Sequence, residues 1–539
     1  MSRSLFAILN QKYGRPIDPV TRRTFVKGMM AATGGLLLSN QASANFKTMQ
    51  QGKKIVVIGA GFSGLAVAHE LASVGYDVTI IEARERLGGR VYSFNDTIRP
   101  DTKKADTWVA GKNAEGGGEL IGSNHPCWVH YAEKFGLEFL DMGDESAEAP
   151  IVLDGKRLTP EESEKLWETM EGVLQRMTAD SVTVNSLEPW KTENAAALDK
   201  KTCADFINAQ PDLDAFTKGA CDVLLSSDNA VEIAMQSYLG MLTCIAGAGG
   251  ERYFTESEVY RCKGGNQQLA FKLAEAIGMK KITLNLAVSE ITIKGNKVMV
   301  TCRDGRTIEA DDVIVTVPPS VWHKIKFNPG LPATLKPQTG VALKYLAEMK
   351  KKFWRDSELS QYMLSDDFLS QTWDGTDAQE EGEGASFHCF SGGQAAVDAM
   401  KIKKTERDAK YGAFISSVYP SFKDNFVRSR FMDWPNDPWT MQGYSFPAPG
   451  EVTTIGPALW NGIGGKIHFA GEHCSYQFVG YMEGGLNSGV QLARRLAARD
   501  GLSVPEIMMP PAPVEPEEPA PEEVPAEAPT TNPVEVPAA

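Results

Sequence analysis

The sequence has no apolar run long enough to span a bilayer, and its cysteines and histidines do not cluster. The 539 residues include eight cysteines and seven histidines. The cysteines occur singly, without a C-x-x-C pair or a neighbouring histidine, which argues against a zinc ribbon and a dense disulfide framework. A membrane helix needs about 20 consecutive apolar residues, and no segment provides them. The sequence therefore predicts neither a metal site nor a membrane span.

Outside the N-terminus, acidic residues outnumber basic ones. The net charge is -14 at pH 7. Residues 1–44 hold six basic side chains and one acid, whereas residues 504–539 hold eight acids and no base. The acidic body between them argues against binding of nucleic acid or of an anionic membrane through the overall field, and weakly favours cationic substrates.

The first 44 residues have the order of an export signal. Paired arginines in "TRRTFVK" (residues 21–27) precede the short apolar run "GMMAATGGLLL" and the small-residue pattern "ASA". This order resembles a twin-arginine signal, whose pathway carries folded proteins and suits one that loads its cofactor first. We expect recognition by the twin-arginine translocation machinery and a mature protein that is periplasmic or secreted.

Residues 504–539 form a Pro/Glu-rich tail of low complexity. Proline interrupts helix and sheet, and like-charged glutamates repel, so this segment cannot bury a core. We expect a disordered appendage. The rest of the chain is long enough for two interleaved domains.

The stretch "KKIVVIGAGFSGLAVAHELASVGYDVTIIEARERLGGR" (residues 53–90) predicts a β-α-β unit. An apolar, β-branched run is typical of a buried parallel strand, and apolar residues at helical spacing follow it. Gly59, Gly61 and Gly64 lie at the first turn, where they allow close approach of a pyrophosphate to the helix N-terminus. Glu82 ends the second strand, where its carboxylate can bind both ribose hydroxyls and disfavours NADP. The stretch therefore predicts a dinucleotide site.

The continuation distinguishes FAD from NAD. "EARERLGGR" has the form E-A-x-x-x-x-G-G-R, in which Gly88 and Gly89 let the chain turn back against the cofactor. Arg90 can pair with a phosphate or with the flavin ring region. The pattern resembles the FAD-binding opening of the flavin amine oxidase family, which includes monoamine, polyamine and L-amino acid oxidases.

Later segments resemble the same family. "EGGGELIGSNHPCWVHYAEKFGLE" (residues 115–138) is similar to its second flavin-contact loop and the helix that follows. "KIHFAGEHCSYQFVGYMEGGLNSGVQLARRLAA" (residues 466–498) is similar to the segment that closes the FAD site, with a helix beginning near Tyr481 to Gly484. The N-terminus of that helix is expected to face the pyrimidine end of the flavin, where negative charge develops on reduction.

The resemblance implies FAD held by several separated segments. Some family members carry a cysteine bonded to FAD just before the tyrosine at position 444, but Gly443 stands there, so we expect non-covalent FAD. The implied cofactor-binding residues are Gly59, Gly61, Ser63, Gly64, Glu82, Ala83, Arg84, Gly89, Arg90, Gly117, Gly118, Glu119, Leu120, Val288, Gly471, Glu472, Tyr481 and Met482.

Four residues are implied at the reacting end. In "TGVALKYLAEMKKKFW" the resemblance makes Lys344 the strand lysine that holds a water beside flavin N5 and assists reaction with oxygen. Strand alternation places it among small or apolar neighbours, where a lysine needs a partner. Tyr444 and Tyr481 are the expected walls of an aromatic cage that aligns the amine, and Trp434 is expected to flank the flavin.

The expected fold is a mixed α/β architecture in which a Rossmann-like FAD-binding domain is interleaved with a substrate domain of helices and a mixed sheet. The FAD-binding domain is assigned to residues 52–130, 255–325 and 455–500. The substrate domain is assigned to residues 131–254, largely helical, and 326–454.

The implied function is FAD-dependent oxidative deamination. Our main hypothesis is an L-amino acid oxidase that transfers hydride to flavin N5 and yields 2-oxo acid, ammonia and hydrogen peroxide. The alternative is a mono- or polyamine oxidase, because "GELIG" lacks the arginine with which some relatives bind a carboxylate. Arg252, Arg261 and Arg430 are other candidates for that role. A dehydrogenase with another electron acceptor, a flavin-binding protein without turnover, and a homodimer all stay open.

Overall fold

A computed structural model describes residues 10, 12–13, 52–142, 147–380 and 382–508. The predicted export signal (residues 1–44) and the predicted tail (residues 504–539) lie almost entirely outside these residues. In the part of the chain so described, no helix has the length and apolar character needed to cross a membrane.

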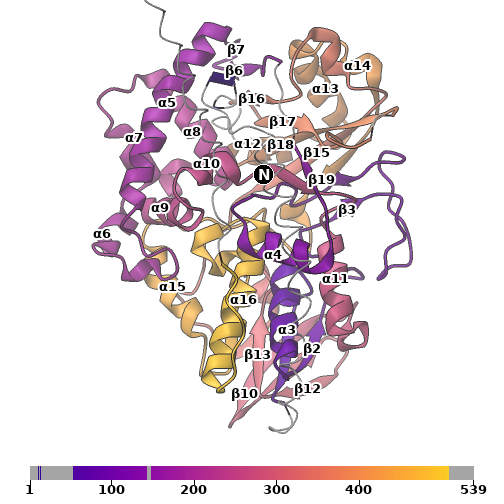
Figure 1. The fold of residues 1–539 in the computed structure, drawn as a ribbon, viewed down its shortest axis with the longest axis vertical. Coiled ribbons are helices and arrows are strands. Elements are labelled where there is room, and N and C mark those ends of the chain that lie inside the picture. The colour runs from indigo at the N-terminus through magenta and orange to yellow at the C-terminus, as the bar shows by residue number, and fades with distance from the viewer. Residues whose placement is uncertain (1–9, 11, 14–51, 143–146, 381, 509–539) are drawn as a thin grey trace, which may run out of the picture.

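A five-stranded parallel sheet forms one end of the molecule, with strand order β20-β13-β1-β2-β9 (Figure 1). The central strand β1 (Lys54–Ile58) is the apolar run predicted above, and four of its five residues are buried. Burial of both faces explains why this strand is apolar throughout. Its neighbours are β2 (Asp77–Ile81), β9 (Ile282–Thr283), β13 (Asp312–Val315) and β20 (Ile467–Phe469).

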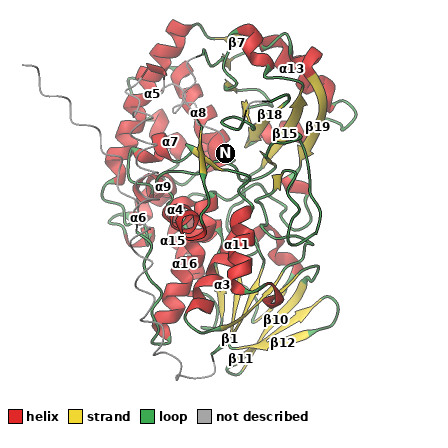
Figure 2. Ribbon diagram, turned by 45° about the vertical axis from the view of Figure 1, so that its right-hand side comes forward, coloured by secondary structure: helices red, strands yellow, loops and turns green. Residues whose placement is uncertain are grey.

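Two helices, α3 (Phe62–Ser73) and α16 (Met482–Arg499), lie side by side against one face of this sheet (Figures 1 and 2). Small residues let them approach closely. A Cβ on Gly489 would lie 2.6 Å from the carbonyl oxygen of Ser63, and the hydroxyls of Ser63 and Ser488 are 3.2 Å apart. Beside them pack α4 (Pro126–Phe135) and α11 (Gln268–Ile277).

A four-stranded sheet, in the order β12-β11-β10-β14, covers the opposite face. Val56 and Ile58 of β1 share a hydrophobic cluster with Ile291 and Val298 of that sheet, whereas Ile55 and Val57 point toward the helices. This alternation is the period of a strand covered on both sides. The strands are β10 (Val288–Lys294), β11 (Lys297–Cys302), β12 (Thr307–Ala310) and β14 (Lys326–Asn328).

The other end of the molecule contains a seven-stranded sheet in the order β19-β15-β18-β17-β16-β6-β7. Strand β15 (Ala342–Met349) pairs antiparallel with β18 (Ala385–Gly392) and β19 (Phe426–Met432). The remaining strands are β6 (Ile151–Leu153), β7 (Lys156–Arg157), β16 (Met363–Ser365) and β17 (Gln371–Asp374). Helices α12 (Gln394–Lys401), α13 (Arg407–Val418) and α14 (Phe422–Asn425) lie beside this sheet.

Helices dominate one side of the molecule, beside the seven-stranded sheet, as expected for residues 131–254 (Figure 2). The longest, α5 (Pro160–Ser181), begins with a capping box in which the Thr159 hydroxyl accepts from the Glu162 N–H and the Glu162 carboxylate accepts from the Thr159 N–H. The others are α6 (Ala195–Lys200), α7 (Cys203–Asn208), α8 (Ala215–Asn229), α9 (Tyr238–Gly247) and α10 (Arg252–Glu256).

The predicted mixed α/β fold class is confirmed, whereas the predicted domain boundaries stay a prediction. Several short connections tie the two ends together. They include β3 (Ser93–Phe94), β4 (Ala114–Glu115), β5 (Phe139–Asp141), β8 (Tyr260–Cys262) and α15 (Glu451–Asn461). All eight cysteines lie in the described ranges and none forms a disulfide.

Candidate active site

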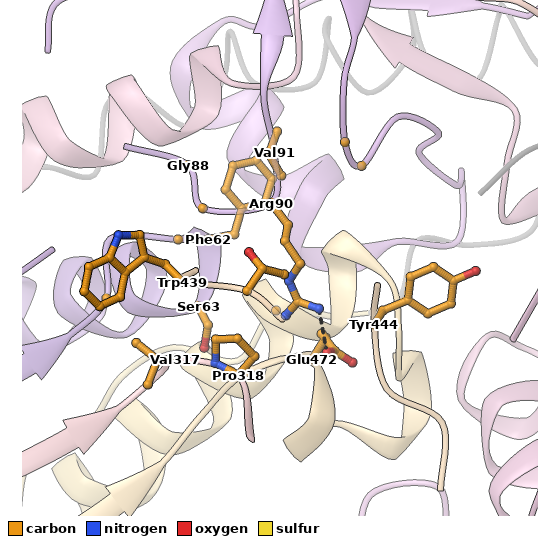
Figure 3. Close-up of a pocket in the computed structure, with 18 of the residues that line it drawn as sticks. Phe62, Ser63, Gly88, Arg90, Val91, Val317, Pro318, Trp439, Tyr444 and Glu472 are labelled. Carbon is orange, nitrogen blue, oxygen red and sulfur yellow. Dashed lines mark hydrogen bonds and ion pairs between the residues drawn. The ribbon is translucent and has the colours of Figure 1, made fainter. Parts of the chain in front are cut away.

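A deep cavity runs from the carboxyl edge of the parallel sheet to strand β15 of the seven-stranded sheet. Its empty space is about 1620 Å³, counting the part open to solvent, which is room for a dinucleotide and a small substrate. Figure 3 shows Ser63, Val317 and Pro318 at one side of this cavity and Tyr444 at the other. The carboxyl edge of an open parallel sheet is where such folds bind their ligands.

The three glycines of the first turn have different roles. Gly59 has φ +111°, a left-handed conformation that side chains rarely adopt. A Cβ on Gly64 would lie 2.0 Å from the carbonyl oxygen of Gly59, so this glycine permits helix and strand to pack, and it does not line the cavity. Gly61 has only the Cα of Gly89 within 4 Å of its Cβ position, at 3.9 Å. Space for a ligand is therefore open in front of Gly61, where α3 begins without a side-chain cap.

Glu82 lies at the end of β2, as predicted, and is 5 % exposed. Its carboxylate accepts hydrogen bonds from the backbone N–H of Ala60 (2.8 Å) and of Arg84 (2.7 Å). These bonds fix the carboxylate at the cavity wall. The Arg84 guanidinium also lines the cavity but is paired with Asp437 and donates to Thr440 (2.7 Å).

Arg90 and Glu472 form an ion pair across the cavity wall, with 2.9 Å between Nη1 and Oε1 (Figure 3). Arg90 also donates to the carbonyl of Gly443 (2.9 Å), and the backbone N–H of Gly480 donates to Glu472 (3.0 Å). Burial works to raise the pKa of Glu472, but Arg90 and the N–H donors hold it below its ordinary value. The sequence assigned Arg90 and Glu472 to the cofactor as two separate contacts. In the structure they form one ion-paired unit.

Lys344 lies on β15 with its side chain turned into the structure, 4 % exposed, at the cavity. Its ammonium donates to the carbonyl of Gly117 (2.7 Å) and to the Glu119 carboxylate (2.7 Å). The partner that burial demands is thus supplied by the glycine-rich loop of residues 115–118 and the acid that follows it. These bonds place the charge of Lys344 against that loop.

The carboxylate of Glu119 is fully buried in a charged cluster, with no exposed side-chain surface. Arg261 Nε lies 2.8 Å away, Trp373 Nε1 donates at 2.8 Å, and His388 Nδ1 lies at 3.0 Å. Burial works to raise the pKa of Glu119, but Lys344, His388 and Arg261 hold it well below its ordinary value. Glu119 is among the residues that line the cavity, and its carboxylate anchors Lys344. Its contact with the cofactor stays a prediction.

Tyr444 and Tyr481 both line the cavity near Lys344, as predicted, and Phe390 lies on the same wall. The Tyr444 hydroxyl donates to the carbonyl oxygen of Asp228 (2.8 Å). Tyr481 is held from behind by His125, whose ring centre is 5.5 Å from its own at an angle of 74°. Burial raises the pKa of both phenols well above the ordinary value, so both rings stay uncharged.

Trp434 also lines the cavity, and its indole N–H donates to the carbonyl of Gly116 (3.0 Å). That bond fixes the tryptophan against the glycine-rich loop. The remaining predicted cofactor residues that line the cavity are Gly59, Ser63, Ala83, Gly89, Gly117, Gly118, Leu120, Val288, Gly471 and Met482. Gly64 is therefore the one predicted site residue that the cavity does not include.

Sequence reasoning missed several residues of this wall. Thr316, Val317 and Pro318 follow β13, and the apolar strand before "TVPP" could have indicated them, since the carboxyl ends of parallel strands meet at one edge. Trp439 and Glu258 line the cavity without any such signal. They come from connections whose position depends on the whole fold.

The arginines considered for a substrate carboxylate lie elsewhere. Arg261 is engaged by Glu119 and donates to the carbonyl of Asp374 (2.9 Å). Arg430 lies 3.1 Å from Asp106. Neither of these, nor Arg252 of α10, is among the residues that line the cavity.

The residues present fit a flavin dinucleotide. The open space at Gly61 and the uncapped start of α3 suit a pyrophosphate. The start of α16, capped by no side chain at Tyr481, borders the other end of the cavity and suits developing negative charge. A Cβ on Gly117 would lie 1.8 Å from the carbonyl oxygen of Arg90, so this loop packs directly against the backbone of Arg90 at the cavity wall.

Comparison with known proteins points to one family. The family model described as flavin containing amine oxidoreductase matches residues 62–497. Among curated relatives, amine oxidase [flavin-containing] B of Canis lupus familiaris is 25% identical over 482 residues, which is 84% of this chain and 87% of that protein. Amine oxidase [flavin-containing] A of Sus scrofa is 26% identical over 477 residues, covering 82% of this chain and 84% of that protein.

Solved structures share the fold. Wild-type putrescine oxidase bound to putrescine superposes with a TM-score of 0.72 at 23% identity, over 83% of this chain and 99% of that one. Cyclohexylamine oxidase from Brevibacterium oxydans gives a TM-score of 0.71 at 23% identity, over 84% of this chain and 100% of that one.

Proposed function

The chain belongs to the family of flavin-containing amine oxidoreductases, and we propose that it is an FAD-dependent oxidase of primary amines. The overall reaction converts an amine R–CH2–NH2, oxygen and water into an aldehyde, ammonia and hydrogen peroxide. Bound flavin would supply the acceptor for the hydride of the amine C–H bond, which carries both electrons.

The chemistry of the substrate end of the cavity carries this proposal. Tyr444 and Tyr481 present uncharged rings, and the cations Lys344 and Arg90 are engaged by Glu119 and Glu472 respectively. The cavity lining also includes an acidic residue, Glu258. Such a surface attracts an amine and repels a carboxylate.

An L-amino acid oxidase, our main hypothesis from the sequence, has less support. It needs a cation for the substrate carboxylate, and Arg252, Arg261 and Arg430 do not line the cavity. The relatives named above are amine oxidases. We therefore prefer the amine to the amino acid as substrate.

The chain's own residues prepare the amine for oxidation. A C–H bond next to nitrogen gives up hydride only when the nitrogen lone pair is free, so the amine must bind unprotonated. Enclosure between Tyr444 and Tyr481 removes water and disfavours the ammonium form. The same two rings restrict the orientation of the substrate carbon. We assign Lys344, which is fixed against the loop of residues 115–118, to the reaction of reduced flavin with oxygen, which its positive charge would assist.

We further propose that FAD is bound non-covalently. None of the described residues that line the cavity is a cysteine or a histidine. Gly443 lies against β15, where a Cβ would come within 2.6 Å of the backbone nitrogen of Ala342. Acid precipitation should release the yellow colour into the supernatant, and colour that stays with the pellet would reject this part of the proposal.

Purified protein loaded with FAD and screened for peroxide against primary amines, L-amino acids and D-amino acids tests the function. We expect peroxide with amines. Turnover of L-amino acids alone would restore the first hypothesis. Anaerobic loss of flavin colour with an amine, without peroxide in air, would indicate a dehydrogenase.

We also propose export through the twin-arginine pathway, on the strength of "TRRTFVK" alone. Replacement of both Arg22 and Arg23 by lysine should leave unprocessed, active precursor in the cytoplasm. Processing at an unchanged rate would contradict the proposal.

A further inference from the structure

A second, smaller cavity adjoins the substrate end of the main one. Glu258 and Tyr481 line both, so they form the wall or passage between them. The rest of the smaller cavity comes from α8, including Leu225 and Asp228, and from α10, including Tyr253. All of these residues lie within the described part of the chain.

Two carboxylates and two tyrosines characterise this smaller cavity. Asp228 and Glu258 are each partly exposed, as are Tyr253 and Tyr481. The ring centres of Tyr253 and Tyr481 lie 6.3 Å apart at 75°. The described residues that line the cavity include no lysine, arginine or histidine. The walls therefore combine negative charge with aromatic faces, both of which attract a cation.

Asp228 also connects the two cavities. Its carboxylate accepts from the side-chain amide of Gln371 (2.9 Å), and its backbone carbonyl accepts from the Tyr444 hydroxyl (2.8 Å). Burial raises the pKa of Asp228 to about 7, although the Gln371 amide works in the other direction. The side-chain partner of this carboxylate is a neutral amide. A cation placed beside it would therefore stabilise the charged form of Asp228.

We propose that Asp228 and Glu258 bind a second ammonium group of the substrate, so that the preferred substrates are aliphatic diamines or polyamines. The proposal rests on the proposed function, because the reacting nitrogen is taken to lie between Tyr444 and Tyr481. The reacting nitrogen loses its proton in the aromatic enclosure. The distal nitrogen keeps its charge beside the carboxylates and against the rings of Tyr253 and Tyr481.

Paired substrates that differ only in the second nitrogen give the first test. We compare diaminobutane with butylamine, and diaminopentane with pentylamine, by kcat/KM for peroxide release. The diamine of each pair should be preferred by at least about tenfold, the range of one partly buried ion pair. Equal kcat/KM values within a pair would overturn the proposal.

Charge-removing variants assign the effect to residues. Asp228→Asn should lower kcat/KM for the diamines by about tenfold and leave the monoamines within about threefold, whereas Glu258→Gln, which also changes the wall of the main cavity, should lower kcat/KM about tenfold more for the diamines than for the monoamines. The matched control is Asp222→Asn, because Asp222 lies on the same helix but accepts from Ser226 Oγ (2.6 Å) at a different cavity. A parallel loss for monoamines and diamines, with FAD content and melting temperature unchanged, would reject the assignment.

Binding of a dication that cannot be oxidised separates this proposal from the proposed function. Hexamethonium and hexyltrimethylammonium differ in one quaternary nitrogen, and neither has a lone pair for hydride transfer. Calorimetry on the FAD-loaded wild type should show hexamethonium binding at least about tenfold tighter, with the difference lost in Glu258→Gln. If no amine reduces the flavin, the proposed function fails, yet this binding difference still supports the cation site. Equal binding of both compounds would overturn the site even in an active oxidase.

Discussion

The two ends of the cavity are built in different ways. At the dinucleotide end the wall is mostly backbone, with Gly59, Gly61 and the start of α3, and one acid, Glu82, fixed by two N–H groups. At the substrate end the wall includes the side chains of Tyr444, in the loop before α15, and of Tyr481, at the start of α16.

This difference has consequences for substitution. At the dinucleotide end a single added methyl group has a large effect, because it would meet the chain itself at Gly64 and would enter the ligand space at Gly61. A side-chain wall can change its chemistry one residue at a time while the fold persists. Substitutions at the dinucleotide end should therefore weaken or abolish cofactor binding, and substitutions at the substrate end should alter reaction rates and substrate preference.

The largest expected effect is at the first turn. Gly61→Ala adds a methyl group that meets nothing closer than 3.9 Å in the protein, so it should fold but exclude the pyrophosphate. We expect FAD affinity to fall roughly 100-fold, with the melting temperature of the apoprotein unchanged.

The matched variant at this turn is Gly64→Ala, whose Cβ would lie 2.0 Å from the Gly59 carbonyl oxygen. It should lose soluble, folded protein rather than only cofactor. Flavin fluorescence titration and circular dichroism measure the two outcomes. If Gly61→Ala binds FAD as the wild type does, the backbone cradle is wrongly assigned.

The next effect concerns Glu82. Glu82→Gln replaces one acceptor oxygen by a donor that faces a backbone N–H of Ala60 or Arg84. We expect FAD affinity to fall about tenfold, because a charged acceptor is lost in a buried place. Fluorescence titration of the apoprotein gives the dissociation constant. An unchanged value would mean that this acid serves the turn and not the cofactor.

At the substrate end, Tyr444→Ala should slow anaerobic flavin reduction by a saturating amine about tenfold, because one wall of the enclosure is lost. Tyr444→Phe keeps the ring and removes only the bond to Asp228, so we expect it to stay within about threefold of the wild type. Stopped-flow absorbance under nitrogen measures the rate constant. Equal slowing in both variants would mean that the hydroxyl, and not the ring, is what matters.

Lys344→Met separates the two half-reactions. The positive charge at the cavity is removed, while Arg261 and His388 still neighbour Glu119. Reoxidation of the reduced flavin by oxygen should slow about fivefold, and reduction by amine should stay within about twofold. Both rates come from the same stopped-flow instrument. Equal slowing of both would reject the oxygen-side role.

The smallest effect is on stability against pH. Burial raises the pKa of Glu115 from 4.5 to about 7, although the Asn113 side chain opposes this. A raised carboxyl pKa contributes stability that is full below the unfolded value and is lost as pH rises through about 7. The melting temperature of the apoprotein should fall by a few degrees across this window. Glu115→Gln should flatten that fall, and an unchanged pH profile would contradict the assignment.

The sequence predicted the dinucleotide end well because its determinants are local. Gly59, Gly61 and Glu82 lie within one β-α-β unit, and each position follows from the geometry of a single turn or strand end. Predictions carried over from the family resemblance, such as Lys344 and Glu472, also fall at the cavity.

The substrate end could not be predicted to the same depth. Lysine burial indicated that Lys344 needs a partner, but nothing in the sequence identified Glu119, which we had assigned to the cofactor. Asp228 lies on α8 and Glu258 follows α10, neither in a motif, and only the tertiary fold brings both to one cavity. Side-chain walls of this kind depend on tertiary packing, which local patterns do not encode.

Anaerobic mixing of the FAD-loaded protein with an aliphatic primary amine tests most directly whether one cavity holds both flavin and amine. The account predicts complete loss of the yellow flavin absorbance, and its return in air with one peroxide released per flavin. A flavin that stays oxidised with every primary amine tried would contradict it.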